Sequence, residues 1–254
     1  MFVPVQLLEC SEIIRRFETA RERSLNALAE IVARGCNVRA ALGSSEADLT
    51  KDAHVCLGLD AELDDWAINL PSRYNYRTVV ADKGIELYED YYHVYNDNDV
   101  IADLNTYRST RILLNAALIV YFQGQLQKPA EVMEQRIREQ MQAGLESSLS
   151  LLLKLGSDIC ASVPCHLGLI PNSGQRKPPQ CWSAMMITQP LAVLASMPWA
   201  PDKLRLWALG RLNYLANEFG NGSCHNLAET IHLRPVLFGQ VFMLRVSDQH
   251  PYTE

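Results

Sequence analysis

The segment CASVPCHLG, residues 160–168, holds the side chains best suited to covalent or metal chemistry. Cys165 directly precedes His166, and Cys160 lies five residues before Cys165. A thiolate nucleophile needs a base that the fold places beside it, and adjacent residues seldom point at one atom. Pro164 is expected to break a helix here. We therefore predict a helix end followed by a turn, with a nucleophile or a metal site as the alternative.

A second candidate is CHNLAETIH, residues 224–232, which places two histidines on one helical face. His225 and His232 are seven residues apart, and Glu229 lies between them. Two imidazoles and a carboxylate could bind a transition metal. A solvated helix face is the simpler interpretation. We predict no metal site, no cofactor and no catalytic residue.

The stretch DVIADLNTYRSTRILLNAALI, residues 99–119, carries Arg108 and Arg111 one helical turn apart. Their simplest role is an ion pair or a polar bond between packed helices, because nucleic-acid recognition needs more basic neighbours. Leu114 and Leu118 are expected on the buried face of this helix. If the scaffold holds a ligand, polar and aromatic residues between the central helices are the expected pocket lining. They are Tyr107, Arg108, Arg111, His166 and Trp182.

Other acidic residues have structural interpretations. Neighbours on a helix diverge by about 100°, so Asp64 and Asp65 are predicted to be surface charges. Asp97 and Asp99 are predicted to cap the helix that follows them. The sequence contains no phosphate-binding glycine fingerprint, no G-x-S-x-G elbow and no H-E-x-x-H motif.

The composition is that of a globular protein, with 254 residues of which 48% are hydrophobic and 20% charged. The net charge of -6, without a run of Lys or Arg, disfavours binding to a phosphate backbone. The seven cysteines are odd in number and none is paired at zinc-site spacing, so we expect reduced thiols in an intracellular compartment. No secretory signal is expected. No membrane-spanning helix is expected either, because the apolar runs fall short of the about 20 residues that such a helix needs.

Apolar residues recur at helical spacing through most of the chain. Helices are expected over about 5–34, 44–71, 99–124, 131–159, 182–195, 202–220 and 222–233. Gly35 is expected to stop the first helix, and Ser44 and Ser45 to cap the second. Pro190 is expected to end or kink the helix over 182–195. The connection 72–98 is expected to hold one short helix near 85–91, and the tail after Pro235 a strand or a short helix. The fold class is all-α, a single helical domain of about seven or eight packed helices.

Four blocks of sequence resemble a known family when they are taken in order. They are LDAELDDWAINLPSRYNYRTV (59–79), YHVYNDNDVIADLNTYRSTRILLNAALI (92–119), IREQMQAGLESSLSLLLKLGSDICASVPCHLG (137–168) and ITQPLAVLASMPWAPDKLRLWALGRLNYLANEFG (187–220). Together they resemble the C-terminal regulatory region of fungal binuclear zinc-cluster transcription factors. On this resemblance, residues 1–43 are an N-terminal helical segment and 44–254 the regulatory domain, continuous with it.

The resemblance implies a nuclear protein that controls genes, often those of a secondary-metabolite cluster. It implies action through other regulatory proteins, a homodimer partner or a small-molecule effector. The family's DNA-binding module, six cysteines holding two zinc ions, has no counterpart in this sequence, so we expect no direct DNA binding by this chain alone. The alternative is an enzyme or a ligand-binding auxiliary protein of a biosynthetic pathway on the same scaffold.

Overall fold

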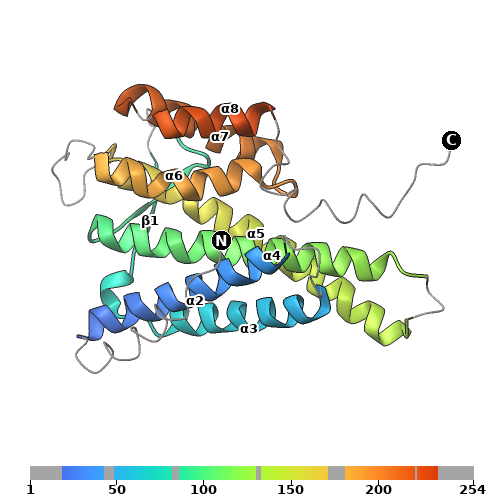
Figure 1. The fold of residues 1–254 in the computed structure, drawn as a ribbon. Coiled ribbons are helices and arrows are strands. Elements are labelled where there is room, and N and C mark those ends of the chain that lie inside the picture. Colours follow the sequence, from blue (N-terminus) through green and yellow to red (C-terminus); the bar gives the residue numbers. More distant parts are fainter. Residues whose placement is uncertain are drawn as a thin grey trace. The chain divides into compact units, whose positions relative to one another are not determined.

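The computed structural model describes residues 19–42, 49–81, 86–129, 133–170, 181–220 and 222–233. These residues form seven α-helices and one two-stranded sheet (Figure 1), which confirms the all-α prediction. Their contacts group into two compact units. Unit 1 comprises the described residues of Met1–Leu70 and Thr110–Leu151, and unit 2 those of Pro71–Ser109 and Leu152–Gln240. The long helices α4 (Asn98–Leu126) and α5 (Gln135–His166) contribute residues to both units.

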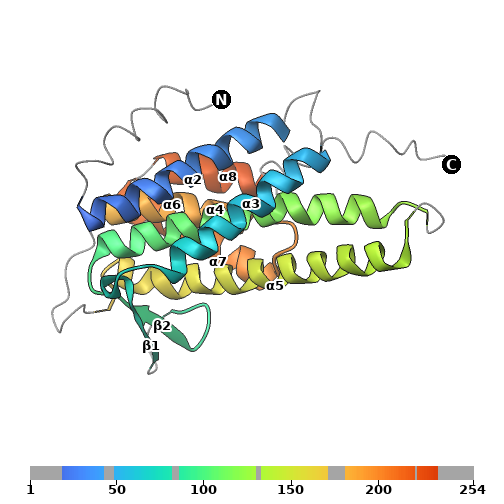
Figure 2. The ribbon, with the colours of Figure 1, turned by 90° about the horizontal axis from the view of Figure 1, so that it is seen from below.

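Unit 1 contains a pair of packed helices, α2 (Ala20–Leu42) and α3 (Leu49–Ile68), seen side by side in Figures 1 and 2. The buried residues of α3 recur at steps of three and four and form one apolar face: Ala53, Cys56, Leu59, Leu63 and Trp66. The Trp66 indole Nε1 donates a hydrogen bond of 2.7 Å to the backbone oxygen of Ser24 on α2. The predicted apolar face of α3 is therefore confirmed, and the indole bond joins it to α2.

The predicted helix stop at Gly35 is wrong, because α2 continues to Leu42. Glycine inside a helix costs only about 0.5–1 kcal/mol relative to alanine, which tertiary packing overrides. Gly35 is buried, and a Cβ placed there would lie 3.8 Å from side-chain atoms of Leu114 and Thr110. The expected caps Ser44 and Ser45 lie outside the described residues.

Pro164 was predicted to break a helix and Pro190 to end or kink one, and each lies within a helix. Pro164 is within α5 and Pro190 within α6 (Cys181–Ser196). Proline removes one backbone donor, yet the turn after Pro164 is completed by bonds of 2.9 Å from Leu167 N to Val163 O and from Leu169 N to Pro164 O. Val163 and Leu167 are also 1% and 0% exposed, so burial of this turn offsets the lost hydrogen bond.

Local end signals correctly predicted the boundaries of three helices. The Asp97 carboxylate accepts a 2.8 Å hydrogen bond from the Val100 backbone N–H and caps α4. Helix α7 (Asp202–Phe219) ends at Gly220, whose φ of 60° is left-handed, and α8 (Gly222–Leu233) follows. In unit 2, α7 packs against both α6 and α8.

The short helix expected near residues 85–91 is wrong in its described part. The chain forms a 3-10 turn (Ser72–Tyr74) and then an antiparallel hairpin of β1 (Arg77–Val80) and β2 (Tyr91–Val94), visible in Figure 2. Thr78 is paired with His93 in this hairpin. Side chains alternate between the faces of a strand, and the alternating His93 and Tyr95 are each 3% exposed. Burial of that face determines the strand.

Helix α5 is long and apolar enough, by length and composition, to cross a membrane, which the sequence expectation did not foresee. However, 61% of its most apolar window is buried inside the protein. The core helix of a globular domain passes the same test. This helix therefore gives only weak support for a membrane span.

Replacing Gly144 by alanine is expected to destabilise the protein, because the new Cβ would lie 2.7 Å from Cζ of the buried Phe122 ring. Overpacking typically costs about 1–3 kcal/mol, partly offset by the better helix propensity of alanine. We expect a net loss of about 1 kcal/mol in urea-induced unfolding. In the matched Gly58→Ala variant nothing lies within 4 Å of the new Cβ, so a gain is expected. Equal effects of the two changes would contradict the packing at Gly144.

Candidate functional site

The predicted pocket residues lie in different surroundings. Tyr107, Arg108 and His166 belong to unit 2 and are 8%, 2% and 2% exposed, whereas Arg111 belongs to unit 1 and is 9% exposed. Trp182 lies in the first turn of α6, and its side chain is outside the described residues. Arg108 and Arg111 each anchor a separate group of polar residues.

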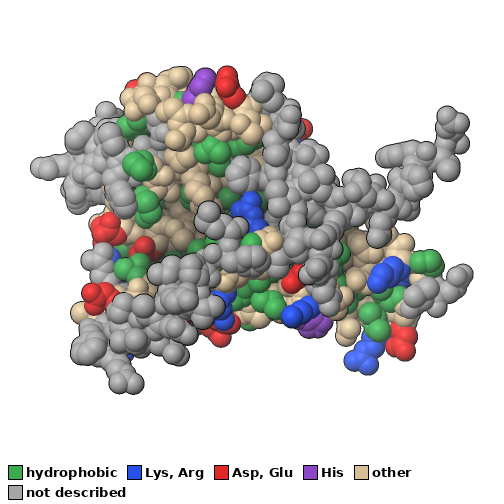
Figure 3. Space-filling view, viewed as in Figure 1, with side chains coloured by type: hydrophobic (Ala, Val, Ile, Leu, Met, Phe, Trp, Pro, Cys, Tyr) green, Lys and Arg blue, Asp and Glu red, His purple; other side chains and the backbone are tan. Residues whose placement is uncertain are grey.

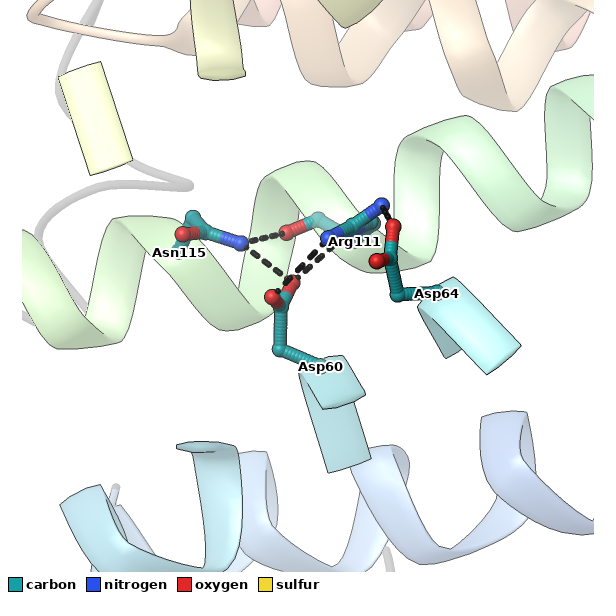
Figure 4. Close-up of polar contacts among 4 residues, drawn as sticks. All are labelled: Asp60, Asp64, Arg111 and Asn115. Carbon is teal, nitrogen blue, oxygen red and sulfur yellow. Dashed lines mark hydrogen bonds and ion pairs between the residues drawn. The ribbon is translucent and has the colours of Figure 1, made fainter. Parts of the chain in front are cut away.

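The Arg111 cluster consists of Arg111 and Asn115 on α4 with Asp60 and Asp64 on α3 (Figure 4). The Arg111 Nε and Nη2 donate to the two oxygens of Asp60 at 2.9 and 3.2 Å, and Nη1 donates to Asp64 at 2.5 Å. Asn115 Nδ2 donates to Asp60 at 2.6 Å and to the Arg111 carbonyl at 3.0 Å. Two helices are thus joined through one guanidinium.

Every nitrogen of the Arg111 guanidinium donates to a carboxylate of this chain, so the group is not available to bind a ligand. The side chains of Arg111 and Asp60 are only 11% and 19% exposed, which strengthens the charge-assisted bonds. This confirms the predicted polar bond between helices. Asp64 is 52% exposed and so lies near the surface as expected, but the sequence interpretation missed its bond to Arg111. The four-residue spacing of Asp60 and Asp64 was the available signal.

The Arg108 cluster lies wholly in unit 2 and comprises Tyr76, His93, Tyr95, Asn105, Arg108, Asp158 and Ser162. The Arg108 Nη1 donates to the Tyr95 hydroxyl at 3.0 Å and to Asn105 Oδ1 at 2.9 Å. Asn105 Nδ2 in turn donates to Ser162 Oγ on α5 at 2.8 Å. Asn105, Arg108 and Ser162 are at most 2% exposed, so this polar chain is enclosed within the unit.

Aromatic rings from the hairpin and its flanks cover the guanidinium of Arg108. The rings of Tyr76 and Tyr95 lie 5.4 and 5.9 Å from its Cζ, within cation–π range. The Tyr76 ring also lies 4.3 Å from the His93 ring and 5.0 Å from the Tyr95 ring. His93 and Tyr95 are buried, but Tyr76 is 37% exposed. The sequence interpretation missed all of these rings because it missed the hairpin.

Burial and the Arg108 charge set the ionisation of this cluster. Burial, with a smaller contribution from Arg108, lowers the pKa of His93 from 6.5 to about 3. Burial also raises the pKa of Tyr95, and it raises the pKa of Asp158 although Arg108 and Lys154 act in the opposite direction. His93 is therefore neutral at pH 7 and poorly suited to proton transfer there.

Acidification is expected to lower the free energy of unfolding through His93. Its pKa is lower in the folded state, so its contribution is complete above pH 6.5 and is lost as the pH falls toward 3. The loss is about 1.4 kcal/mol per pH unit. Urea unfolding at pH 7 and pH 5 should show a smaller pH dependence in His93→Asn than in the wild type. The exposed His54→Asn variant is the control, and equal pH dependence in the wild type and His93→Asn would contradict this role of His93.

Burial disfavours the thiolate form of Cys56 and Cys160. Burial, followed by the charges of Asp52 and Asp60, raises the pKa of Cys56 to about 12. Burial likewise raises the pKa of Cys160, while Cys165 is 1% exposed. A nucleophile or metal ligand needs the thiolate, which these surroundings disfavour. The predicted helix end is confirmed at His166, where α5 stops before a turn containing Gly168 with φ 68°.

Of the histidine pair on α8, only the His225 side chain is described. His225 Nε2 lies 3.5 Å from Glu229 Oε1, and both side chains are more than half exposed at 59% and 63%. The side chain of His232 is outside the described residues. Within the described part of the chain, no group of three or more metal-ligating side chains is present.

Figure 3 shows few described Lys and Arg side chains. Those that are visible stand singly or in small groups. Arg108 and Arg111 are buried, so neither adds to that surface. Phosphate-backbone affinity depends on clustered positive charge.

Comparisons of the chain with protein-family models, curated proteins and solved structures find no significant match.

Proposed function

We propose that this chain is a transcription-regulator-like protein of the nucleus that acts through other regulatory proteins or a small effector. Control of a metabolic gene cluster, such as one for a secondary metabolite, is the role that the family resemblance implies. The printed sequence holds no six-cysteine zinc cluster, so we assign promoter contact to a partner protein that brings one.

One observation carries the proposal: the sequence blocks behind the resemblance contact one another through polar side chains. In unit 1, Arg111 of the second block binds Asp60 of the first at 2.9 Å. In unit 2, Asn105 of the second block binds Ser162 of the third at 2.8 Å.

The second block also contacts the fourth block in unit 2. Ser109 Oγ of the second block donates to Gln189 Oε1 of the fourth at 3.2 Å. Four separated motifs thus share a structural reason to occur together, since each of the other three has a polar partner in the second block. This supports the family resemblance and, through it, a regulatory role.

Four groups that could have served in catalysis are poorly suited to it. The His93 ring is kept neutral, the Cys56 and Cys160 thiols are kept protonated, and Arg111 is fully engaged by carboxylates. Groups with matched pKa values near the working pH characterise acid–base catalysts. These features support a regulatory scaffold.

A tethering experiment tests the proposal. The chain is fused to a heterologous DNA-binding module and expressed with a reporter gene that carries the matching site. We expect the wild-type fusion to change reporter output several-fold relative to the module alone. A fusion carrying Leu114→Ala and Leu118→Ala, which disrupt the core, should lose the effect.

An unchanged reporter with a folded, nuclear wild-type fusion would count against the proposal, particularly if deleting the gene leaves the transcript profile unaltered. Accumulation of one pathway intermediate in the deletion strain, with normal transcripts, would instead favour the enzyme or auxiliary-protein alternative.

A further inference from the structure

The guanidinium of Arg108 has donors that its own protein does not use. A guanidinium carries five N–H groups. Both hydrogen bonds of Arg108 leave from Nη1, to Tyr95 and Asn105. Neither Nε nor Nη2 donates a hydrogen bond to a described residue, and both atoms keep some contact with solvent. That edge, with two parallel N–H groups, is the geometry that binds a carboxylate in a bidentate manner.

The charge of Arg108 also lacks a close counter-charge. It is 2% exposed, and no described carboxylate forms an ion pair with it. Asp158 acts on it only at longer range. A buried charge without a close counter-charge is unfavourable, so an anion added at this point would meet little competition from the protein's own carboxylates. Arg111, by contrast, has its carboxylates in place.

Tyr76 contacts Arg108 and also reaches the surface, since the residue is 37% exposed. Its ring lies over the guanidinium with 5.4 Å between the ring centroid and Cζ, and it is the most exposed residue of the cluster. Displacement of this side chain would uncover the guanidinium while the bonds to Tyr95 and Asn105 hold Arg108 in place. The remaining walls, His93 and Tyr95, are aromatic.

We propose that the Nε–Nη2 edge of Arg108 binds a small organic carboxylate, with Tyr76 as a movable cover. The single positive charge and the proximity of Asp158 favour a monoanion over a phosphate dianion. The aromatic walls favour a ligand with an aromatic or apolar body. The site is independent of the regulatory role, and its test uses the purified chain without any promoter or reporter.

The test is a titration of the 15N-labelled full chain with sodium benzoate, followed through arginine Nε–Hε signals by NMR. Sodium phosphate and sodium chloride at matched ionic strength are the comparison salts. Benzoate should shift the Arg108 signal in a saturable manner, and the other two salts should not. Arg108→Lys, which keeps the charge and loses the two-pronged edge, should weaken benzoate binding about tenfold or more, measured by calorimetry.

The control variant is Arg205→Lys, since the Arg205 side chain is 24% exposed and pairs with Asp202 at the surface. It should bind benzoate as the wild type does. No saturable shift of the Arg108 signal at tens of millimolar benzoate would overturn the site, and an equal response to phosphate would overturn the carboxylate assignment.

If the Arg108→Lys variant does not fold, the Tyr76→Ala variant tests the proposed site instead, because it leaves Arg108 in place. Association of benzoate should become several-fold faster once the cover is removed. Unchanged association kinetics would overturn the role of Tyr76.

Discussion

Replacing Leu114 and Leu118 together by alanine is expected to leave the protein largely unfolded at 25 °C. The two side chains are 4% and 2% exposed. Each large-to-small change in a core costs about 2–5 kcal/mol, and the two changes lie one turn apart on α4, so their cavities adjoin. Their combined cost is comparable to the total stability of a typical domain, about 5–15 kcal/mol. Circular dichroism and urea titration measure the effect.

The matched control is Leu57→Ala on α3, whose side chain is 46% exposed. Truncating an exposed leucine leaves no cavity, so a change within about 0.5 kcal/mol is expected. If the double variant and the control had the same urea midpoint, Leu114 and Leu118 would not be core residues. Single variants at both positions show whether the losses add, since adjoining cavities couple.

Elements set by local chemistry were predictable from the sequence. The Asp97 cap, the Gly220 helix end and the one-sided apolar face of α3 all depend on residues within a few positions of each other. These signals operate in the isolated chain. Because they need no knowledge of the tertiary contacts, they predicted the helix boundaries well.

Elements set by distant contacts were not predictable in this way. Gly35 carries a local stop signal, yet its helix continues to Leu42, and α5 continues past Pro164 to His166. The cost of each residue is local, whereas the burial that offsets it comes from other helices. Intrinsic preference is a weak prior where a segment is deeply packed.

In the candidate sites, too, local features were predictable from the sequence and distant contacts were not. The sequence predicted an ion pair or a polar bond between packed helices for Arg108 and Arg111. Arg111 forms one, whereas Arg108 donates to Tyr95 and to Asn105 on its own helix. The sequence did not identify Asp60 or Asp64, which lie about fifty residues before Arg111. It also missed the rings around Arg108, although the alternation of His93 and Tyr95 was a readable strand signal. Partner identity follows from packing between helices, which a single sequence does not specify.

Replacing Arg111 by methionine is expected to lower the free energy of unfolding by about 3–5 kcal/mol. The change keeps much of the side-chain length and removes the charge that neutralises Asp60, whose side chain is only 19% exposed. The carboxylate then remains buried beside Asn115 without a cation. Urea unfolding measures the loss, and it should exceed that of Arg34→Met. The Arg34–Glu62 pair is 42% and 47% exposed, so its removal should cost under about 1 kcal/mol.

A double variant separates the lost ion pair from general damage to the helix pair. Adding Asp60→Asn to Arg111→Met removes the orphaned charge, and the amide retains an oxygen to accept from Asn115. Removing both partners of a buried pair costs less than removing one, so the double variant should be more stable than Arg111→Met alone. If the second change lowered stability further, the penalty at Arg111 would come from lost packing of its alkyl stem. A rise in stability would show that Arg111 mainly compensates the buried negative charge of Asp60.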